Sequence, residues 1–200
     1  MASNNLVELA IEYPQRLSRL HLLLKLFLGW LYVGVPHGFI LFFYGILVGI
    51  ATFVAFWAIL FTGRYPRSLF IFVVGYIRWK TRVGAYFIYL MTDNYPPFSS
   101  GGSQALTLEV EYPEHLSRGK ALLKLFFGWL YVGIPHGFAL FFYSIAAFVV
   151  LAISWWSILI FGRFPQGFFS FVEGLLRWNL RVSVYSIFLR DEYPPFSGRP

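Results

Sequence analysis

The chain is a tandem duplication of one sequence unit. The string LLKLFLGWLYVGVPHGF at residues 23–39 returns as LLKLFFGWLYVGIPHGF at residues 122–138. A long match of this kind means that one structural unit is used twice, so both copies must be explained by the same fold.

The match extends almost to both ends of the chain. An EYP string at residues 12–14 and 111–113 marks the start of each copy, and a YPPFS string at residues 95–99 and 193–197 marks the end. The expected organisation is repeat 1 at residues 1–99, a linker at residues 100–105 and repeat 2 at residues 106–200.

The composition indicates a membrane protein. The chain is 58% apolar and 12% charged, whereas a soluble domain is about half apolar and about a quarter charged. Leu26–Thr62 and Leu125–Phe161 contain no charged residue, and each is far longer than the ~20 residues of a spanning helix. The net charge of +7 lies at the edges of these stretches, which favours anionic lipid headgroups over nucleic acid as the partner.

Each copy is expected to open with a short strand. Residues 7–12 and 106–111 alternate apolar and polar residues, a pattern typical of a half-buried strand. Two such strands are marginal alone, so we expect them to pair with each other or with a partner's sheet edge.

The uncharged stretches predict a bent helical hairpin in each repeat, at residues 20–62 and 119–161. The arm before Pro36 is about 21 Å long, too short to cross a ~30 Å hydrocarbon core. Pro36 and Pro135 lack a backbone donor, so we expect a helix break there. The alternative is one long kinked helix per repeat, with the following helix as its return crossing.

That following helix, residues 66–91 and 165–190, carries charges in its middle, such as Arg78 and Arg82. A charge at the bilayer centre costs on the order of 3 kcal/mol on insertion scales. An amphipathic helix in the membrane plane is therefore expected.

Basic residues flank both ends of the hairpin in each copy, which predicts an even number of crossings and parallel copies with cytoplasmic termini. The expected fold class is all-α integral membrane protein: two parallel repeats, each with a short strand, a kinked membrane-inserted hairpin and an interfacial helix. No cleavable signal peptide is evident. The absence of cysteine excludes disulfides and thiolate ligands.

Several motifs occur in the same order in both copies: EYPxxLSR, LKLFxGWLYVGxPHGF, FxGRxP, RWxxRV and YPPFS. Together they resemble a bacterial membrane-protein family known as the domain of unknown function numbered four-three-eight-nine, present here twice. The resemblance implies a bacterial integral membrane protein, and we expect it to be a multi-pass protein of the inner membrane. It implies no catalytic residues.

His37 and His136 follow the two prolines at equivalent positions. We expect each imidazole to hydrogen-bond at the helix break. The alternative is that two parallel copies bring both imidazoles together as ligands of a haem iron or another metal. No metal site is otherwise expected.

Arginine offers a planar fork of donors that suits phosphate, so six arginines are candidates for binding lipid phosphate. The alternative is that they extend to the interface and pair with acids such as Glu173. The candidates are Arg64, Arg78, Arg82, Arg163, Arg177 and Arg181.

Small residues let membrane helices approach closely. The predicted packing positions are Gly29, Gly34, Gly45, Gly49, Gly128 and Gly133. The YPPFS tails could dock on a partner as extended segments or lie across their own repeat.

The sequence favours a non-enzymatic scaffold or accessory subunit that packs against other membrane proteins or against itself, with bound phospholipid. The first alternative is an anionic-lipid-binding protein. A haem- or metal-binding redox subunit is the third hypothesis. Transport is the weakest, because the uncharged stretches offer no ionisable path.

Overall fold

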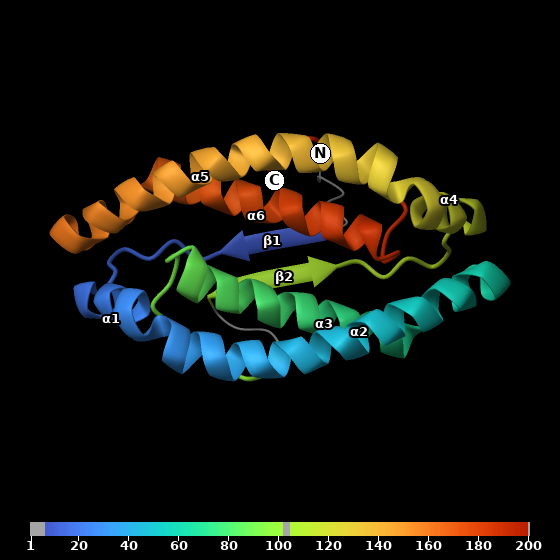
Figure 1. The fold of residues 1–200 in the computed structure, drawn as a ribbon, viewed down its shortest axis with the longest axis horizontal. Coiled ribbons are helices and arrows are strands. Elements are labelled where there is room, and N and C mark those ends of the chain that lie inside the picture. The colour runs from blue at the N-terminus through green and yellow to red at the C-terminus, as the bar shows by residue number, and fades with distance from the viewer. Residues whose placement is uncertain (1–6, 102–104, 200) are drawn as a thin grey trace.

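Two long helices run antiparallel along opposite edges of the molecule, with two shorter helices and a two-stranded sheet between them (Figure 1). The computed structural model describes residues 7–101 and 105–199. Half a turn about the viewing axis of Figure 1 brings each repeat onto the other. Repeat 1 contains β1 (Val7–Ile11), α1 (Arg19–Gly29), the π-helical turn η1 (Trp30–Gly34), α2 (Val35–Thr62), α3 (Arg67–Val83) and the π-helical turn η2 (Gly84–Ile88). Repeat 2 contains β2 (Leu106–Val110), α4 (Arg118–Gly128), the π-helical turn η3 (Trp129–Gly133), α5 (Ile134–Phe161) and α6 (Gln166–Ser186).

The predicted hairpin at residues 20–62 is wrong, and so is its counterpart at residues 119–161. Helix α1, the turn η1 and α2 form one continuous helix, Arg19–Thr62, and repeat 2 has the equivalent helix Arg118–Phe161. We call these the first and second long helices. Each has 44 residues, a length of about 66 Å at 1.5 Å per residue. The alternative to the hairpin, one long helix per repeat, agrees with the course of these two helices.

The proline does not break the long helix because the tail of the same repeat supplies the missing donor. In a regular helix, the N–H of residue 36 would bond the carbonyl of Tyr32, but Pro36 has none. The backbone widens into a π-turn at this point, and the Tyr95 hydroxyl donates to the Tyr32 carbonyl at 3.1 Å. Such local π adjustments and side-chain donors allow helices to continue through proline.

Repeat 2 uses the same device. The Tyr193 hydroxyl donates to the Tyr131 carbonyl at 3.0 Å, four residues before Pro135. The tyrosine of each YPPFS string is thus bonded to the turn before the proline of its own repeat. These tails lie across their own repeats, one of the two arrangements considered for them.

Helices α3 and α6 pack back along α2 and α5 after sharp turns. Gly63 and Gly162 occupy these turns with φ of 72° and 68°, a left-handed conformation that glycine adopts without steric cost. The predicted interfacial helices are slightly longer than the observed ones at their C-terminal ends.

Repeat 1 holds one more residue than repeat 2 near the end of this helix. Tyr86 matches Tyr185 at a spacing of 99, whereas Asp93 matches Asp191 at a spacing of 98. The extra residue falls at η2, where the helix widens into a π-turn that α6 lacks. The two tails consequently start from equivalent places.

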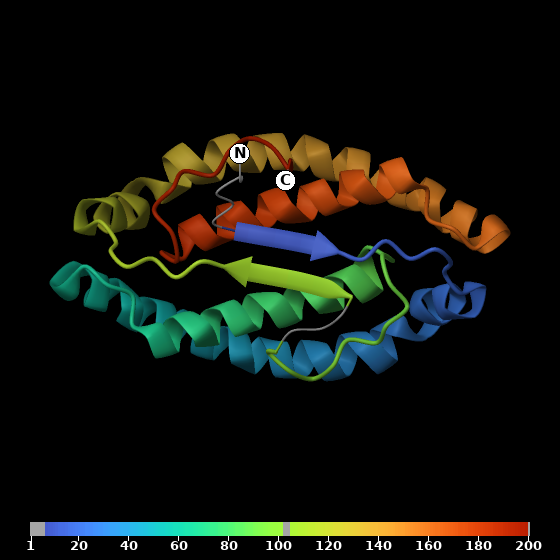
Figure 2. The same cartoon turned by 180° about the vertical axis from the view of Figure 1, so that it is seen from behind.

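The two strands pair with each other, as one of the predicted arrangements required. Strands β1 and β2 are antiparallel, with Leu9 opposite Leu108 at the centre. Leu9 and Leu108 are buried, while Glu8 and Glu109 are exposed. The sheet lies on the face opposite the long helices, and Figure 2 shows it in front of them.

Each repeat begins on the other repeat. The N–H of Leu17 bonds the carbonyl of Gly162 at 2.9 Å, and the N–H of Leu116 bonds the carbonyl of Gly63 at 2.8 Å. Strand β1 packs against α6, and β2 packs against α3. The EYP segment of one copy therefore covers the FxGRxP turn of the other, which links two motifs that the sequence shows far apart.

We predict that the tyrosine donors are needed only because of the prolines. Replacing Tyr95 and Tyr193 by Phe removes both donors and also the bond between His37 Nε2 and the Tyr95 hydroxyl, so it should cost about 3 kcal/mol of unfolding free energy, at about 1 kcal/mol per lost bond. In a background of Pro36→Ala and Pro135→Ala, the backbone supplies the donors and the same replacement should cost much less. Thermal unfolding of the four variants in mild detergent measures this coupling, with Tyr143→Phe as a control. Equal costs in both backgrounds would contradict the explanation.

Candidate functional site

A buried lysine joins the start of the first long helix to the tail of repeat 1. Lys25 Nζ lies 2.8 Å from the Asp93 carboxylate and donates to the Thr92 carbonyl at 2.7 Å. The other Asp93 oxygen accepts from the N–H of Ser18, the residue that caps the helix. The ammonium also lies over the Tyr86 ring at 4.2 Å. A lysine with a side chain 2% exposed is stable only with such partners.

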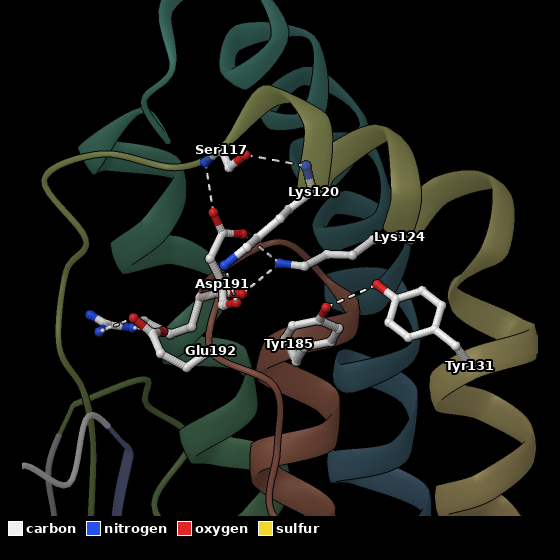
Figure 3. A network of polar contacts seen from close by, with 8 residues as sticks. Ser117, Lys120, Lys124, Tyr131, Tyr185, Asp191 and Glu192 are labelled. Carbon is white, nitrogen blue, oxygen red and sulfur yellow. Dashed lines mark hydrogen bonds and ion pairs between the residues drawn. The ribbon is translucent and has the colours of Figure 1, made fainter.

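Repeat 2 carries the same network, drawn in Figure 3. Lys124 Nζ lies 2.8 Å from the Asp191 carboxylate and donates to the Arg190 carbonyl at 2.6 Å. The Ser117 N–H donates to the other carboxylate oxygen at 2.6 Å. The network therefore clamps the tail to the beginning of the long helix in both copies.

A pair of tyrosines extends each network toward the proline turn. The hydroxyls of Tyr32 and Tyr86 are 3.0 Å apart, and those of Tyr131 and Tyr185 are 2.9 Å apart. Burial, followed by the bond from the partner hydroxyl, raises the pKa of Tyr86 and of Tyr185 well above its ordinary value. These hydroxyls therefore stay protonated and act as hydrogen-bonding groups.

The sequence interpretation missed these lysine, aspartate and tyrosine residues. The signal was available, since identical polar residues occupy matching positions in both copies. The matched pairs are Lys25 and Lys124, Asp93 and Asp191, Tyr32 and Tyr131, Tyr86 and Tyr185, and Tyr95 and Tyr193.

His37 is fully buried and bonded at both ring nitrogens. Its Nδ1 accepts from the indole N–H of Trp79 at 3.1 Å, and its Nε2 lies 3.1 Å from the Tyr95 hydroxyl. Because Tyr95 donates to the Tyr32 carbonyl, Nε2 carries the proton and donates to Tyr95. Phe98 of the tail stacks on the imidazole with ring centroids 4.0 Å apart.

His136 has similar surroundings, with Trp178 donating to its Nδ1 at 3.0 Å and Phe196 stacked at 3.9 Å, but its buried Nε2 has no hydrogen-bond partner among the described residues. The two histidines belong to α2 and α5, on opposite sides of the sheet (Figure 1). The structure thus does not bring them together as a ligand pair. Within residues 7–101 and 105–199, no group of three His, Asp or Glu side chains has the spacing of a metal site.

The arginines in the middle of α3 and α6 hold the sheet. Arg78 Nε donates to the Leu108 carbonyl at 3.0 Å, and Arg177 Nη2 donates to the Leu9 carbonyl at 3.0 Å. Arg177 also lies 3.3 Å from Glu173, the acid named in the sequence alternative. Each guanidinium therefore fixes the strand that belongs to the other repeat.

Arg82 and Arg181, one turn further on, hold the tails. Arg82 donates to the carbonyl of Ser99, and Arg181 donates to the carbonyl of Arg199 at 2.8 Å. Burial lowers the pKa of Arg82, and the nearby Arg78 lowers it further. Arg64 and Arg163 lie exposed at the turns after the long helices.

The predicted glycine positions divide into two kinds. Gly29 lies against the Phe87 ring and Gly45 against the Tyr76 hydroxyl, so these two allow a side chain of the following helix to approach. Gly49 has open space beside it. Gly34, Gly128 and Gly133 lie in or beside the π-turns, where nothing approaches an added Cβ more closely than 3.7 Å.

Exposed apolar side chains are concentrated on the long helices. Examples are Phe42, Phe53, Phe141 and Phe148, each more than half exposed. No charged residue interrupts the two helices after Lys25 and Lys124. By length and hydropathy, both long helices could cross a membrane.

These features define a helical tandem-repeat protein with a strongly apolar face. The chain belongs to the family described as Domain of unknown function (DUF4389), whose model matches residues 24–100 and 123–198. No curated protein and no solved structure matches it significantly. The tandem duplication and the family expected from the motifs are therefore confirmed.

We predict that Lys124→Met destabilises the protein by about 3 kcal/mol, because the partly buried Asp191 carboxylate loses its partner. Lys120→Met is the control on the same helix. The side chain of Lys120 is exposed and makes one hydrogen bond, of 3.3 Å to the Asp191 carbonyl, so its loss should change the free energy of unfolding by less than about 0.5 kcal/mol. Chemical unfolding in detergent gives both values, and similar values would refute the clamp.

The glycine positions give a second test. An added Cβ at Gly29 would clash with the Phe87 ring, whereas at Gly49 it meets nothing. Gly49→Ala should raise the unfolding free energy by up to about 1 kcal/mol through helix propensity. Gly29→Ala should lower it by about 1 kcal/mol or more, since overpacking opposes the same gain. Stabilisation of both variants would show that Gly29 is not a packing position.

Proposed function

We propose that this protein is a non-enzymatic membrane scaffold or accessory subunit that lies in one leaflet. The apolar faces of the long helices contact the lipid, and the sheet faces water. The observation that carries the proposal is the position of two carboxylates, Glu8 and Glu109, in the sheet at the centre of the molecule.

Glu8 and Glu109 are directly opposite each other in the sheet register, and both are exposed. Two like charges this close are unfavourable unless water screens them. The sheet lies midway along the long helices (Figure 2). If those helices crossed the bilayer along their length, the carboxylates would sit at the level of the hydrocarbon core, where charge is costly.

The length of the long helices supports the same arrangement. About 66 Å of helix is more than twice the ~30 Å hydrocarbon thickness. A helix that crossed the membrane would therefore have to tilt far away from the membrane normal. A multi-pass protein with cytoplasmic termini was the sequence expectation. In the arrangement proposed here, the apolar face enters only the headgroup and upper acyl region, as amphipathic helices do.

With the sheet facing water, the symmetry axis of the two repeats coincides with the membrane normal. Both copies then have the same orientation, in keeping with the parallel repeats expected from the charge distribution. If the membrane is the bacterial inner membrane, the sheet and tails lie on its cytoplasmic side.

The scaffold role is supported by how the polar side chains are used. The buried lysines, histidines and arginines bond to backbone carbonyls, carboxylates and aromatic groups of the same chain. They build a rigid slab, so the interacting surface is the long apolar face, open to lipid and to other membrane proteins or a second copy. The haem hypothesis is not taken further, because the helices that carry the two histidines, α2 and α5, lie on opposite sides of the sheet (Figure 1) and His37 already uses both ring nitrogens.

A cysteine-labelling experiment tests the single-leaflet arrangement, and the chain has no native cysteine to remove. Single cysteines replace His21 and Arg64, near the two ends of the first long helix, and Glu8 in the sheet. In sealed vesicles, we expect a membrane-impermeant maleimide to label all three from the same side. Phe53→Cys, on the apolar face, should react only after detergent is added. Labelling of His21→Cys and Arg64→Cys from opposite sides would show that the helix crosses the membrane and refute the proposal.

A further inference from the structure

A basic cleft lies at the junction between the repeats. It has a volume of about 900 Å³ and is lined by residues 13 and 16–20 of repeat 1 and by residues 157 and 161–165 of repeat 2. Three of the lining residues are arginines, Arg16, Arg19 and Arg163, and none is acidic. Because the sequence interpretation treated each repeat separately, it did not join Arg16 and Arg19 to Arg163.

The cleft keeps most of its guanidinium donors free. Arg19 donates one bond, from Nη2 to the Ile160 carbonyl at 2.6 Å. Within residues 7–101 and 105–199, the side chains of Arg16 and Arg163 make no hydrogen bond or ion pair with another described residue. Asp93, the acid of the clamp in repeat 1, is already bonded to Lys25 and to the Ser18 N–H. Three like charges without an internal counter-charge favour an anion.

The cleft also lies at the edge of the apolar face. Leu20 and Phe161 line it and are 66% and 69% exposed, respectively. Leu20 belongs to the start of the first long helix, and Phe161 ends the second. A ligand in this place could bring a phosphate to the arginines and a hydrocarbon chain to the neighbouring apolar side chains.

We infer that this cleft binds the phosphate group of an anionic phospholipid. The inference rests on the proposed function, since it needs the apolar face to be in the membrane. It moves the lipid site away from the arginines of α3 and α6, whose donors hold the strands and tails. Arg16 and Arg163 contribute free forks of donors, the geometry that suits phosphate oxygens.

At the three arginine positions of the cleft, the opposite end of the molecule differs by one residue. The positions that match Arg19 and Arg163 are Arg118 and Arg64, but the position that matches Arg16 is His115. An imidazole lacks the five-donor fork of a guanidinium. The Arg16 end is therefore the stronger phosphate site of the two.

The test measures lipid binding to the purified protein in mild detergent by native mass spectrometry. The variant is Arg16→Gln with Arg163→Gln, which leaves the Arg19 bond in place and breaks no hydrogen bond or ion pair between described residues. The control, Lys80→Gln with Arg199→Gln, removes the same charge at exposed positions outside the cleft. The probes are phosphatidylglycerol, phosphatidylcholine and inorganic phosphate.

We expect the affinity of the variant for phosphatidylglycerol to fall by about tenfold or more, at about 1 kcal/mol per basic residue, while the control stays within about twofold. Competition by millimolar inorganic phosphate would assign the site to phosphate itself, and its absence would assign it to the lipid. A variant that binds phosphatidylglycerol as tightly as the control overturns the inference.

Flotation with phosphatidylcholine vesicles separates this outcome from failure of the proposed function. Wild type and variant should float equally, because the apolar face is unchanged. If wild type does not float, the membrane proposal is wrong. If it floats and the arginine variant still retains phosphatidylglycerol, only the lipid site is wrong.

Discussion

The hydrogen bond from the Tyr95 hydroxyl to the Tyr32 carbonyl determines much of this structure. It allows the first long helix to pass Pro36 without a break, and the unbroken helix creates one continuous apolar face. The same tyrosine positions the tail, whose Asp93 pairs with Lys25 at the helix start. The equivalent bond in repeat 2 comes from Tyr193. Helix continuity, tail position and the buried ion pair therefore depend on one another.

The sequence predicted the duplication, because the motifs recur in order, and the strands, because their alternation of apolar and polar residues is a local pattern. It failed at Pro36, because the donor that replaces the missing N–H comes from Tyr95, 63 residues after Tyr32. Local rules correctly identify the orphaned carbonyl and cannot identify its partner. The arginines of α3 show the same limit, since Arg78 bonds a strand of the other repeat. Comparison of the two copies held the missing information, in the polar residues that they share.

Polar groups in this protein have two distinct uses. Those on the inner side of the long helices, such as Lys25 and His37, are buried and hold segments of one chain together. Those at the ends and on the sheet, such as Arg16 and Glu8, remain exposed and meet the surroundings. A fold with so much exposed apolar surface needs the first group for rigidity, since little of the long helices is buried by packing. In the proposed membrane arrangement, the second group sets the orientation of the protein at the interface.

The exchange of opening segments means that one repeat alone is incomplete. A chain with a single copy would lack the strand that packs against α3 or α6 and the segment that covers its FxGRxP turn. It would need a second chain to supply both. Tandem duplication amounts to a covalently fused dimer, in which assembly is intramolecular and independent of concentration. Fusion also allows the two halves to differ in sequence. A homodimer would carry the same residue at both ends, whereas this chain carries Arg16 at one junction and His115 at the other.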